Sequence, residues 1–301
     1  MVFDEFKNAF NRYNNGHVQL IIINVVIFII LAVFYVLSTV SGFNIIGPIH
    51  DQFSIPPLFT DFIQRPWTIL TYAFAHSLTD IFHILFNMLA LYWFGKLFIE
   101  YLGNDKLIAV YVLGALAGGI VYLLMFNTIP YFKNLSGFPG MVGASAAVYA
   151  ILVAVATLLP DYTLFLMFLG PVRIKYIALF YIVISFIGSV GPNAGGNLAH
   201  LGGALMGFIY IKQLQAGVNW GAWVTATLEW IKGIFQPSSK VKVSYRKTEP
   251  SAKKSSSSSS AGKAAKASQE EIDHILDKIS DKGYESLSKE EKEKLFNASK
   301  K

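Results

Sequence analysis

The chain contains a long apolar run near its beginning, Val18–Val40, with no charged residue in it. A helix needs roughly 20 predominantly apolar residues to cross the hydrocarbon core of a bilayer, and this run is long enough. Further apolar segments follow along the chain. They are Asp80–Phe98, Leu107–Phe126, Gly143–Leu159, Tyr176–Ser189 and Leu198–Leu214. The sequence therefore predicts an all-α polytopic membrane protein with a bundle of six transmembrane helices.

The composition fits this class, because 53% of the 301 residues are hydrophobic and only 15% are charged. Soluble domains carry about 25% charged residues. Most of the net charge of +6 lies in the tail 240–301, where basic and acidic residues are mixed, and such a tail does not predict a nucleic-acid partner. Cysteine is absent, which excludes disulfides and thiolate chemistry, and no pattern indicates a metal or a cofactor.

The chain is predicted to divide into five parts. After residue 214 the sequence is less apolar but carries three tryptophans, which favours a helix in the membrane interface over a seventh span. The Ser/Lys-rich stretch that follows predicts a disordered linker. The parts are a cytoplasmic N-terminal segment (1–17), a six-span membrane domain (18–214), an interfacial amphipathic segment (215–236), a linker (237–267) and a small cytoplasmic helical hairpin (268–301).

Two capping boxes predict the terminal hairpin. Ser268 with Glu271 begins a first helix, and Ser288 with Glu291 begins a second, shorter one. Gly283 fits the end of the first helix. The hairpin leaves room for a partner, whose nature the sequence does not indicate.

Two connections within the membrane domain are unusual. Ser41–Trp67 is rich in glycine and proline, which predicts neither helix nor strand, yet its phenylalanines and isoleucines favour a place in the membrane interface. Tyr162–Lys175 is interrupted by Gly170 and Pro171, and it predicts a connection with a re-entrant or interfacial apolar piece.

Basic residues predict the orientation. Arg173 and Lys175 lie between the fourth and fifth segments, Lys96 and Lys106 lie at the turn between the second and third, and the basic tail follows the sixth. With six spans these residues share one side with the N-terminus, and the positive-inside rule places that side in the cytoplasm. We expect a multi-pass protein of the cell (inner) membrane, without a cleavable signal peptide and with both termini cytoplasmic.

Several polar residues fall inside the apolar segments, where an unpaired polar group is costly. They are His83 and Asn87 in the second segment, Ser145 in the fourth and His200 in the sixth. All lie near the outer beginnings of their segments and so at similar depth. Singly, each has an ordinary explanation, such as a serine bonded to its own i−4 carbonyl. An ordinary structural role is assigned to the remaining histidines, which are His17, His50, His76 and His274, although His76 is close to the proposed site.

Their spacing favours a site that opens to the outer face. His83 and Asn87 are four residues apart and share one helix face. Ser145 lies in the first turn of its helix, where backbone N–H groups and the helix dipole favour a developing oxyanion. Gly143 lets the chain turn there, and Tyr149 lies one turn further on, where it can stack on an imidazole and hold it.

Small residues predict close packing of the fourth and sixth segments. These residues are Ala146, Ala150 and Ala154 on the fourth segment and Gly202, Gly203 and Gly207 on the sixth. The contact would bring Ser145 within hydrogen-bond reach of His200. No carboxylate inside a span can complete a triad, so the sequence permits a Ser–His dyad. The G-x-S-x-G elbow and the H-E-x-x-H zinc motif are both absent.

Over roughly residues 60–215 the chain resembles the rhomboid family of intramembrane serine proteases. The second segment matches the family pattern His-x-x-x-Asn, and the fourth matches Gly-x-Ser followed by a tyrosine. The sixth matches Ala-His followed by small residues, here Ala199-His200-Leu201-Gly202-Gly203.

The resemblance implies that Ser145 is the nucleophile and His200 the general base. It further implies that His83, Asn87 and the backbone N–H of Ser145 form the oxyanion hole. The implied substrates are single-span membrane proteins, cleaved within or next to the membrane.

Two positions depart from the family pattern. Ala146 replaces the usual glycine after the serine, and Arg65-Pro66-Trp67 does not match the usual Trp-Arg pair of the first loop. Ala146 motivates an alternative, a catalytically inactive rhomboid-like protein that binds transmembrane helices, although intact Ser145 and His200 argue against it. A transporter is a third hypothesis, but no intramembrane carboxylate is present to couple protons.

Overall fold

The computed structural model describes the chain except for residues 1–14, 136, 138–139, 168, 236–268 and 300–301. The chain divides into two compact units, residues 1–239 and residues 240–301. The predicted linker (237–267) and most of the predicted N-terminal segment (1–17) lie outside the described residues.

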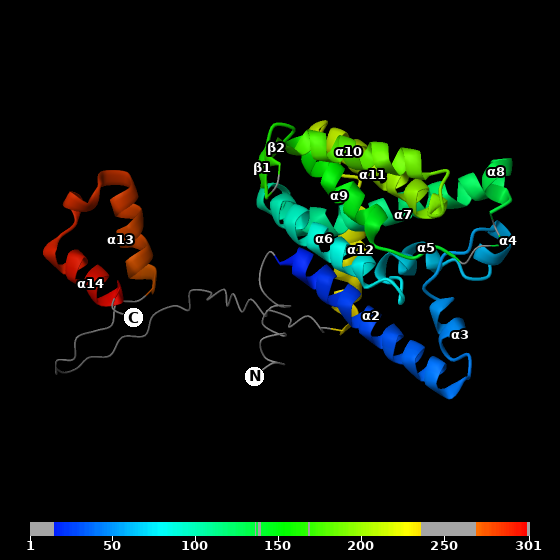
Figure 1. Ribbon diagram of the computed structural model, residues 1–301. Helices are drawn as coiled ribbons and strands as arrows, with labels where there is room; N and C mark the ends of the chain where they lie inside the picture. The colour runs from blue at the N-terminus through cyan, green and yellow to red at the C-terminus, as the bar shows by residue number, and fades with distance from the viewer. Residues whose placement is uncertain (1–14, 136, 138–139, 168, 236–268, 300–301) are drawn as a thin grey trace. The chain divides into compact units, whose positions relative to one another are not determined.

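An α-helix stands at each of the predicted apolar segments (Figure 1). These helices are α2 (Gly16–Ser41), α6 (Ile81–Leu102), α7 (Asn104–Thr128), α9 (Ser145–Leu158), α10 (Ile174–Gly188) and α11 (Ala194–Gln215). Within the described part of the chain, α2, α6 and α7 are long and apolar enough to cross a membrane, while α9 and α10 are apolar but shorter. The chain is therefore a mostly helical membrane protein.

Helix α9 lies at the centre of the first unit and packs against α6, α7, α10 and α11 (Figure 1). Every residue from Ala146 to Ala156 is buried. The cause is in the sequence, because a helix that is apolar on all sides must be covered on all sides. This burial places Ser145, the first residue of α9, at the junction of several helices.

The connection before α6 corrects one expectation. Residues 41–67 hold two short helices, α3 (Ile46–His50) and α4 (Phe59–Phe62), so the prediction of no helix there is wrong in part. Two more short elements follow, α5 (Thr68–Thr71) and the 3₁₀ helix η1 (Tyr72–Phe74). Ile55 and Met141 exchange backbone hydrogen bonds of 3.0 and 2.9 Å, which tie this connection to the strand-like approach to Ser145.

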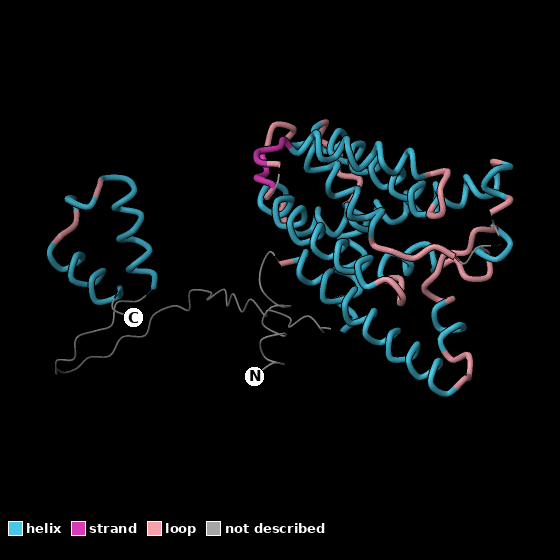
Figure 2. Tube along the Cα trace, in the orientation of Figure 1, coloured by secondary structure: helices cyan, strands magenta, loops and turns pink. Residues whose placement is uncertain are grey.

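A two-stranded antiparallel hairpin joins α9 to α10 (Figure 2). Its strands, β1 (Thr163–Leu166) and β2 (Gly170–Arg173), lie within the segment predicted as a re-entrant or interfacial piece, for which no strand was predicted. At its base Asp161 accepts bonds from Lys175 at 2.7 Å and from Arg173 at 3.1 Å. These two cations, Lys175 first, lower the pKa of Asp161 below its ordinary value.

Two further helices complete the first unit. Helix α8 (Pro130–Lys133) follows α7, and α12 (Ala222–Phe235) occupies the predicted interfacial segment. Helix α12 packs against α7 and buries Val224, while Trp223 and Trp230 stay exposed.

The second unit contains α13 (Gln269–Lys282), the 3₁₀ helix η2 (Tyr284–Ser286) and α14 (Lys289–Ser299). At the start of α14, the backbone N–H of Ser288 donates to Glu291 at 2.7 Å, and the N–H of Glu291 donates to the Ser288 hydroxyl at 3.2 Å. Lys278 of α13 binds the same carboxylate at 2.9 Å. Ser268, predicted to cap α13, lies outside the described residues.

Lowering the pH is expected to loosen α14. The bond from Lys278, followed by the N–H of Ser288, lowers the pKa of Glu291 to about 2 from an ordinary 4.5. Its stabilising contribution is therefore complete above pH 4.5 and is lost as the pH falls from there through about 2. Amide hydrogen exchange in α14, corrected for intrinsic rates, should rise over this range. Glu291→Gln should raise exchange already at pH 7, and equal protection of the wild type at pH 7 and pH 2 contradicts the prediction.

Candidate active site

The approach to Ser145 depends on a glycine. Gly143 has φ +139°, a conformation that side chains with a Cβ rarely adopt, and its N–H donates to the Tyr72 carbonyl at 2.9 Å. A Cβ at Gly143 would lie 2.9 Å from Nε2 of His83. The glycine thus lets the chain turn into α9 while the His83 ring lies against it.

Gly143→Ala is expected to cost about 1–3 kcal/mol in backbone strain and to push the His83 ring from its place. Gly42→Ala is the matched control, because Gly42 also has positive φ, +74°, but nothing lies within 4 Å of its added Cβ. Thermal unfolding should fall in both variants, whereas labelling of Ser145 by a serine-directed probe should fall only in Gly143→Ala. Equal labelling of the two variants contradicts a role for this contact.

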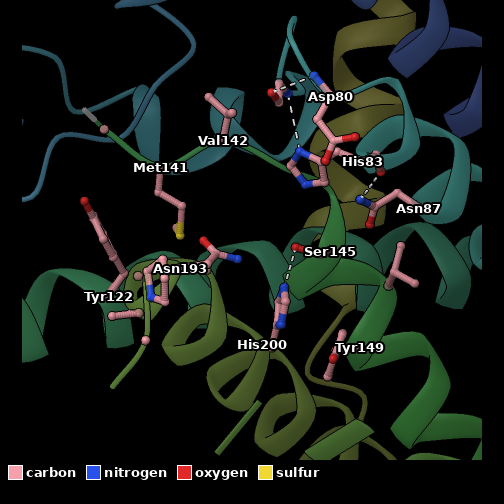
Figure 3. A pocket seen from close by; sticks show the side chains of 18 of the residues that line it. Asp80, His83, Asn87, Tyr122, Met141, Val142, Ser145, Tyr149, Asn193 and His200 are labelled. Atoms are coloured by element: carbon pink, nitrogen blue, oxygen red, sulfur yellow. Dashed lines mark hydrogen bonds between the residues drawn. The ribbon is translucent and has the colours of Figure 1, made fainter. Parts of the chain in front are cut away.

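Ser145 and His200 point toward one another across the junction of α9 and α11 (Figure 3). The distance from the Ser145 hydroxyl to His200 Nε2 is 2.7 Å, a strong hydrogen bond. The structure therefore brings together the two residues that sequence reasoning paired.

Close packing of α9 and α11 produces this distance. A Cβ at Gly203 would overlap the backbone carbonyl oxygen of Ala146, and one at Gly207 would overlap that of Ala150. Only glycine allows such an approach of two helix backbones. The predicted small-residue contact is thus present at Gly203 and Gly207, whereas Gly202 lies against Ala117 of α7 instead.

The far side of His200 is also held. The Tyr149 ring stacks on the imidazole with centroids 4.2 Å apart and an angle of 15° between the planes. The hydroxyl of Ser185, from α10, lies 3.1 Å from Nδ1 of His200 and 2.9 Å from the Tyr149 hydroxyl. Sequence reasoning missed Ser185, although a serine in the apolar helix α10 carries the same signal of a costly polar group that drew attention to Ser145.

His83 and Asn87 of α6 lie at the same site (Figure 3). Nδ1 of His83 accepts from the backbone N–H of Ser77 at 3.4 Å, so the proton of the neutral ring lies on Nε2. That nitrogen faces Gly143 and the start of α9. The Asn87 amide donates to the His83 carbonyl at 2.7 Å, which leaves its second amide hydrogen for another acceptor.

A cavity of about 1130 Å³ gives access to these groups. Its polar lining includes Ser145, His200, His83 and Asn87, and apolar walls come from residues such as Phe86 and Tyr181. Within the part of the chain that the structure describes, no three His, Cys, Asp or Glu side chains gather where a metal ion could bind. The hydroxyl of Ser145 and the imidazole of His200 lie side by side in this cavity.

Comparison with known proteins identifies the family. Residues 64–215, half of the chain, match the rhomboid domain. The chain belongs to the rhomboid family. Residues 263–301 match a family of unknown function (DUF6576), which covers the second unit of this rhomboid from α13 onward.

Curated relatives of this rhomboid match the same half. RHOMBOID-like protein 12, mitochondrial, of Arabidopsis thaliana is 37% identical over 164 residues, 51% of this chain and 48% of the relative. Rhomboid protein 1, mitochondrial, of Saccharomyces cerevisiae is 30% identical over 159 residues, 50% of this chain and 42% of the relative. The chain thus spans less than half the length of these relatives.

Ala146, where the usual family motif has glycine, is accommodated in this rhomboid by a neighbouring glycine. Its side chain faces Gly118 of α7, where an added Cβ would lie 2.6 Å from the Ala146 Cβ. The glycine in α7 therefore leaves room for the extra methyl group, and Ser145 and His200 remain in hydrogen-bond contact at 2.7 Å.

Two further residues make contacts that the sequence does not predict. His76 was grouped with the ordinary histidines, but it is fully buried and its ring lies edge-on to His83 with centroids 5.1 Å apart. The His76 ring thus packs against the ring of His83, a residue of the site. Arg65, for which no role was predicted, binds the carboxylate of Asp51 at 3.3 Å and so joins two parts of the first connection.

Proposed function

We propose that this rhomboid is an intramembrane serine endopeptidase that uses Ser145 and His200 as a catalytic dyad. The observation that carries the proposal is the 2.7 Å contact between the serine hydroxyl and Nε2 of His200, inside a cavity walled by apolar helices. Nucleophilic serine catalysis needs a base within this reach.

The reaction follows from the positions of the atoms. His200 Nε2 takes the proton of the Ser145 hydroxyl as its oxygen attacks the carbonyl carbon of the scissile peptide bond. The tetrahedral intermediate carries a negative oxygen, which the Ser145 N–H, His83 Nε2–H and the free Asn87 amide hydrogen stabilise. The intermediate collapses as His200 returns the proton to the leaving amine. Water, activated by His200, then hydrolyses the acyl-enzyme.

The substrates that suit this site are single-span membrane proteins. Phe86 and Tyr181 line the cavity and are themselves 62% and 43% exposed, so an apolar surface continues from the cavity over α6 and α10. A helix that moves within the bilayer meets this surface directly. We therefore propose that α2, α6, α7, α9, α10 and α11 all span the membrane and that substrates are cleaved within it or next to it.

The topology proposed here keeps both ends of the chain in the cytoplasm, with α13 and α14 as a soluble hairpin open to a partner there. Even-numbered spans then begin at the outer face, where the site opens. The relatives are mitochondrial by name, so they do not support the expected cell (inner) membrane. The proposal therefore states on which side of its bilayer each part of the chain lies, and it does not name the membrane.

Labelling by a fluorophosphonate probe tests the function. The purified detergent-solubilised protein should be labelled, while Ser145→Ala and His200→Ala should not be, because the probe reacts with an activated serine. Equal absence of labelling in all three proteins would overturn the proposal.

The inactive, helix-binding alternative depends on Ala146, whose methyl group lies beside Gly118 of α7. Ala146→Gly should therefore leave labelling within about threefold of wild type and cost about 1–2 kcal/mol, because it adds a glycine to a helix and a small void. Thermal unfolding and labelling rate measure the two effects. A labelling rate that rises tenfold or more would instead show that the alanine suppresses activity.

A further inference from the structure

We propose that Ser185 is a positioning residue that fixes the protonated nitrogen of His200, an inference that rests on the proposed function. Ser185 is fully buried on α10. Its hydroxyl lies between two groups of the site, 3.1 Å from His200 Nδ1 and 2.9 Å from the Tyr149 hydroxyl. Asp80 is the one carboxylate in the described lining of the cavity, and it accepts from the Phe82 N–H at the start of α6 rather than from His200.

The chemistry of the dyad sets the direction of these bonds. Nε2 of His200 must hold a lone pair to accept the Ser145 proton, so the proton of the neutral ring must be on Nδ1. A buried N–H needs an acceptor, and the Ser185 oxygen is within reach of it. The Ser185 hydroxyl donates in turn to Tyr149, and the Tyr149 hydroxyl donates to the Tyr181 carbonyl at 3.5 Å.

The hydrogen bonds of Ser185 differ from those that a serine usually makes in a helix. A serine in an apolar helix ordinarily donates to a carbonyl of its own helix, three or four residues back. Four residues before Ser185 stands Tyr181, whose carbonyl accepts from Tyr149 instead. Ser189, four residues later on the chain, does bond back, to the Phe186 carbonyl at 2.7 Å. Ser185 is thus bonded into the site rather than into its own helix.

This chain of bonds runs one way, from imidazole to serine to tyrosine to carbonyl. The Ser185 oxygen supports the N–H of the neutral ring, and it supports the same N–H when His200 becomes an imidazolium during catalysis. The stacked Tyr149 ring restricts rotation of the imidazole, while Ser185 determines which of its nitrogens faces Ser145 with a lone pair.

Kinetics and nitrogen NMR of the full-length protein in detergent test the inference. Ser185→Ala removes one atom, so the packing is kept, and the matched control is Ser189→Ala, directly after the last residue of the same helix. We expect kcat toward a transmembrane reporter to fall about 10- to 100-fold with KM within twofold, the size of one lost hydrogen bond to a charged group. The ¹⁵N signals of His200, assigned with His200→Gln, should lose their Nδ1–H signature. Ser189→Ala should change neither, and Ser185→Thr, which keeps the hydroxyl, should retain the signature.

The two readouts separate the inference from the function on which it rests. If the wild type neither labels nor cleaves, the proposed function fails, while the ¹⁵N signals still decide the role of Ser185. An unchanged Nδ1–H signature in Ser185→Ala would overturn the inference, whatever the activity. A fall of kcat in Ser189→Ala equal to that in Ser185→Ala would show a general effect of α10 packing and would also overturn it.

Discussion

Ser145→Ala is expected to lower cleavage of a transmembrane reporter in proteoliposomes by at least about 10⁴-fold, the largest effect of any single change in this chain. The variant removes the attacking oxygen and leaves the cavity otherwise intact. Its thermal unfolding should stay close to that of wild type, because the hydroxyl has one described partner, His200. Cleavage is read as product formed per enzyme per hour against wild type.

The double variant sharpens this prediction. Because Ser145 and His200 act as a unit, Ser145→Ala combined with His200→Ala should cleave no more slowly than either single variant. If the two residues contributed independently, the fold-losses of the two single variants would multiply in the double variant. Residual cleavage by Ser145→Ala within tenfold of wild type would show that another nucleophile acts.

Gly203→Val is expected to have the second largest effect, which is a loss of stability of the fold. Any Cβ at residue 203 overlaps the backbone carbonyl oxygen of Ala146, and a backbone atom cannot rotate away. Helices α9 and α11 must then separate, which costs about 3 kcal/mol or more and lengthens the contact between Ser145 and His200. Thermal unfolding should fall by several degrees at least, and probe labelling should be lost.

Gly233→Ala is the matched control. Gly233 also lies in a helix, α12, but nothing lies within 4 Å of its added Cβ. Alanine is favoured over glycine in a helix by about 1 kcal/mol, so this variant should be as stable as wild type or slightly more so. If Gly203→Val unfolds at the same temperature as Gly233→Ala, the stability of the fold does not depend on the close approach of α9 and α11, and the prediction is wrong.

The sequence predicts much of this molecule because two of its patterns are strong. Apolar runs are visible without any knowledge of contacts, and the glycines and alanines of α9 and α11 share a spacing that only a tight helix pair explains. Together they bring Ser145 beside His200. The predicted roles of these residues, and of His83, Asn87 and Tyr149 around them, stay predictions until the variants are measured.

The features that the sequence does not predict depend on how helices are rotated against one another and on contacts between distant segments. A lone serine such as Ser185 is read as bonded to its own helix unless the rotation of α10 against α9 is known. The hairpin at 163–173 was missed because a short apolar stretch with Gly170 fits a strand pair as well as an interfacial turn. The sequence places His76 close to the site, but its contact with the His83 ring exists only in the folded chain and could not be predicted.

The contact between Ala146 and Gly118 has a consequence for which residues the two positions can accept. The alanine methyl occupies the space that a side chain at residue 118 would need. That side chain would also meet the backbone carbonyl oxygen of Ala199 on α11, which lies 2.9 Å from an added Cβ. Glycine at 118 is therefore required by α11 as well as by α9, and Ala146→Gly alone would not make room for a side chain at residue 118.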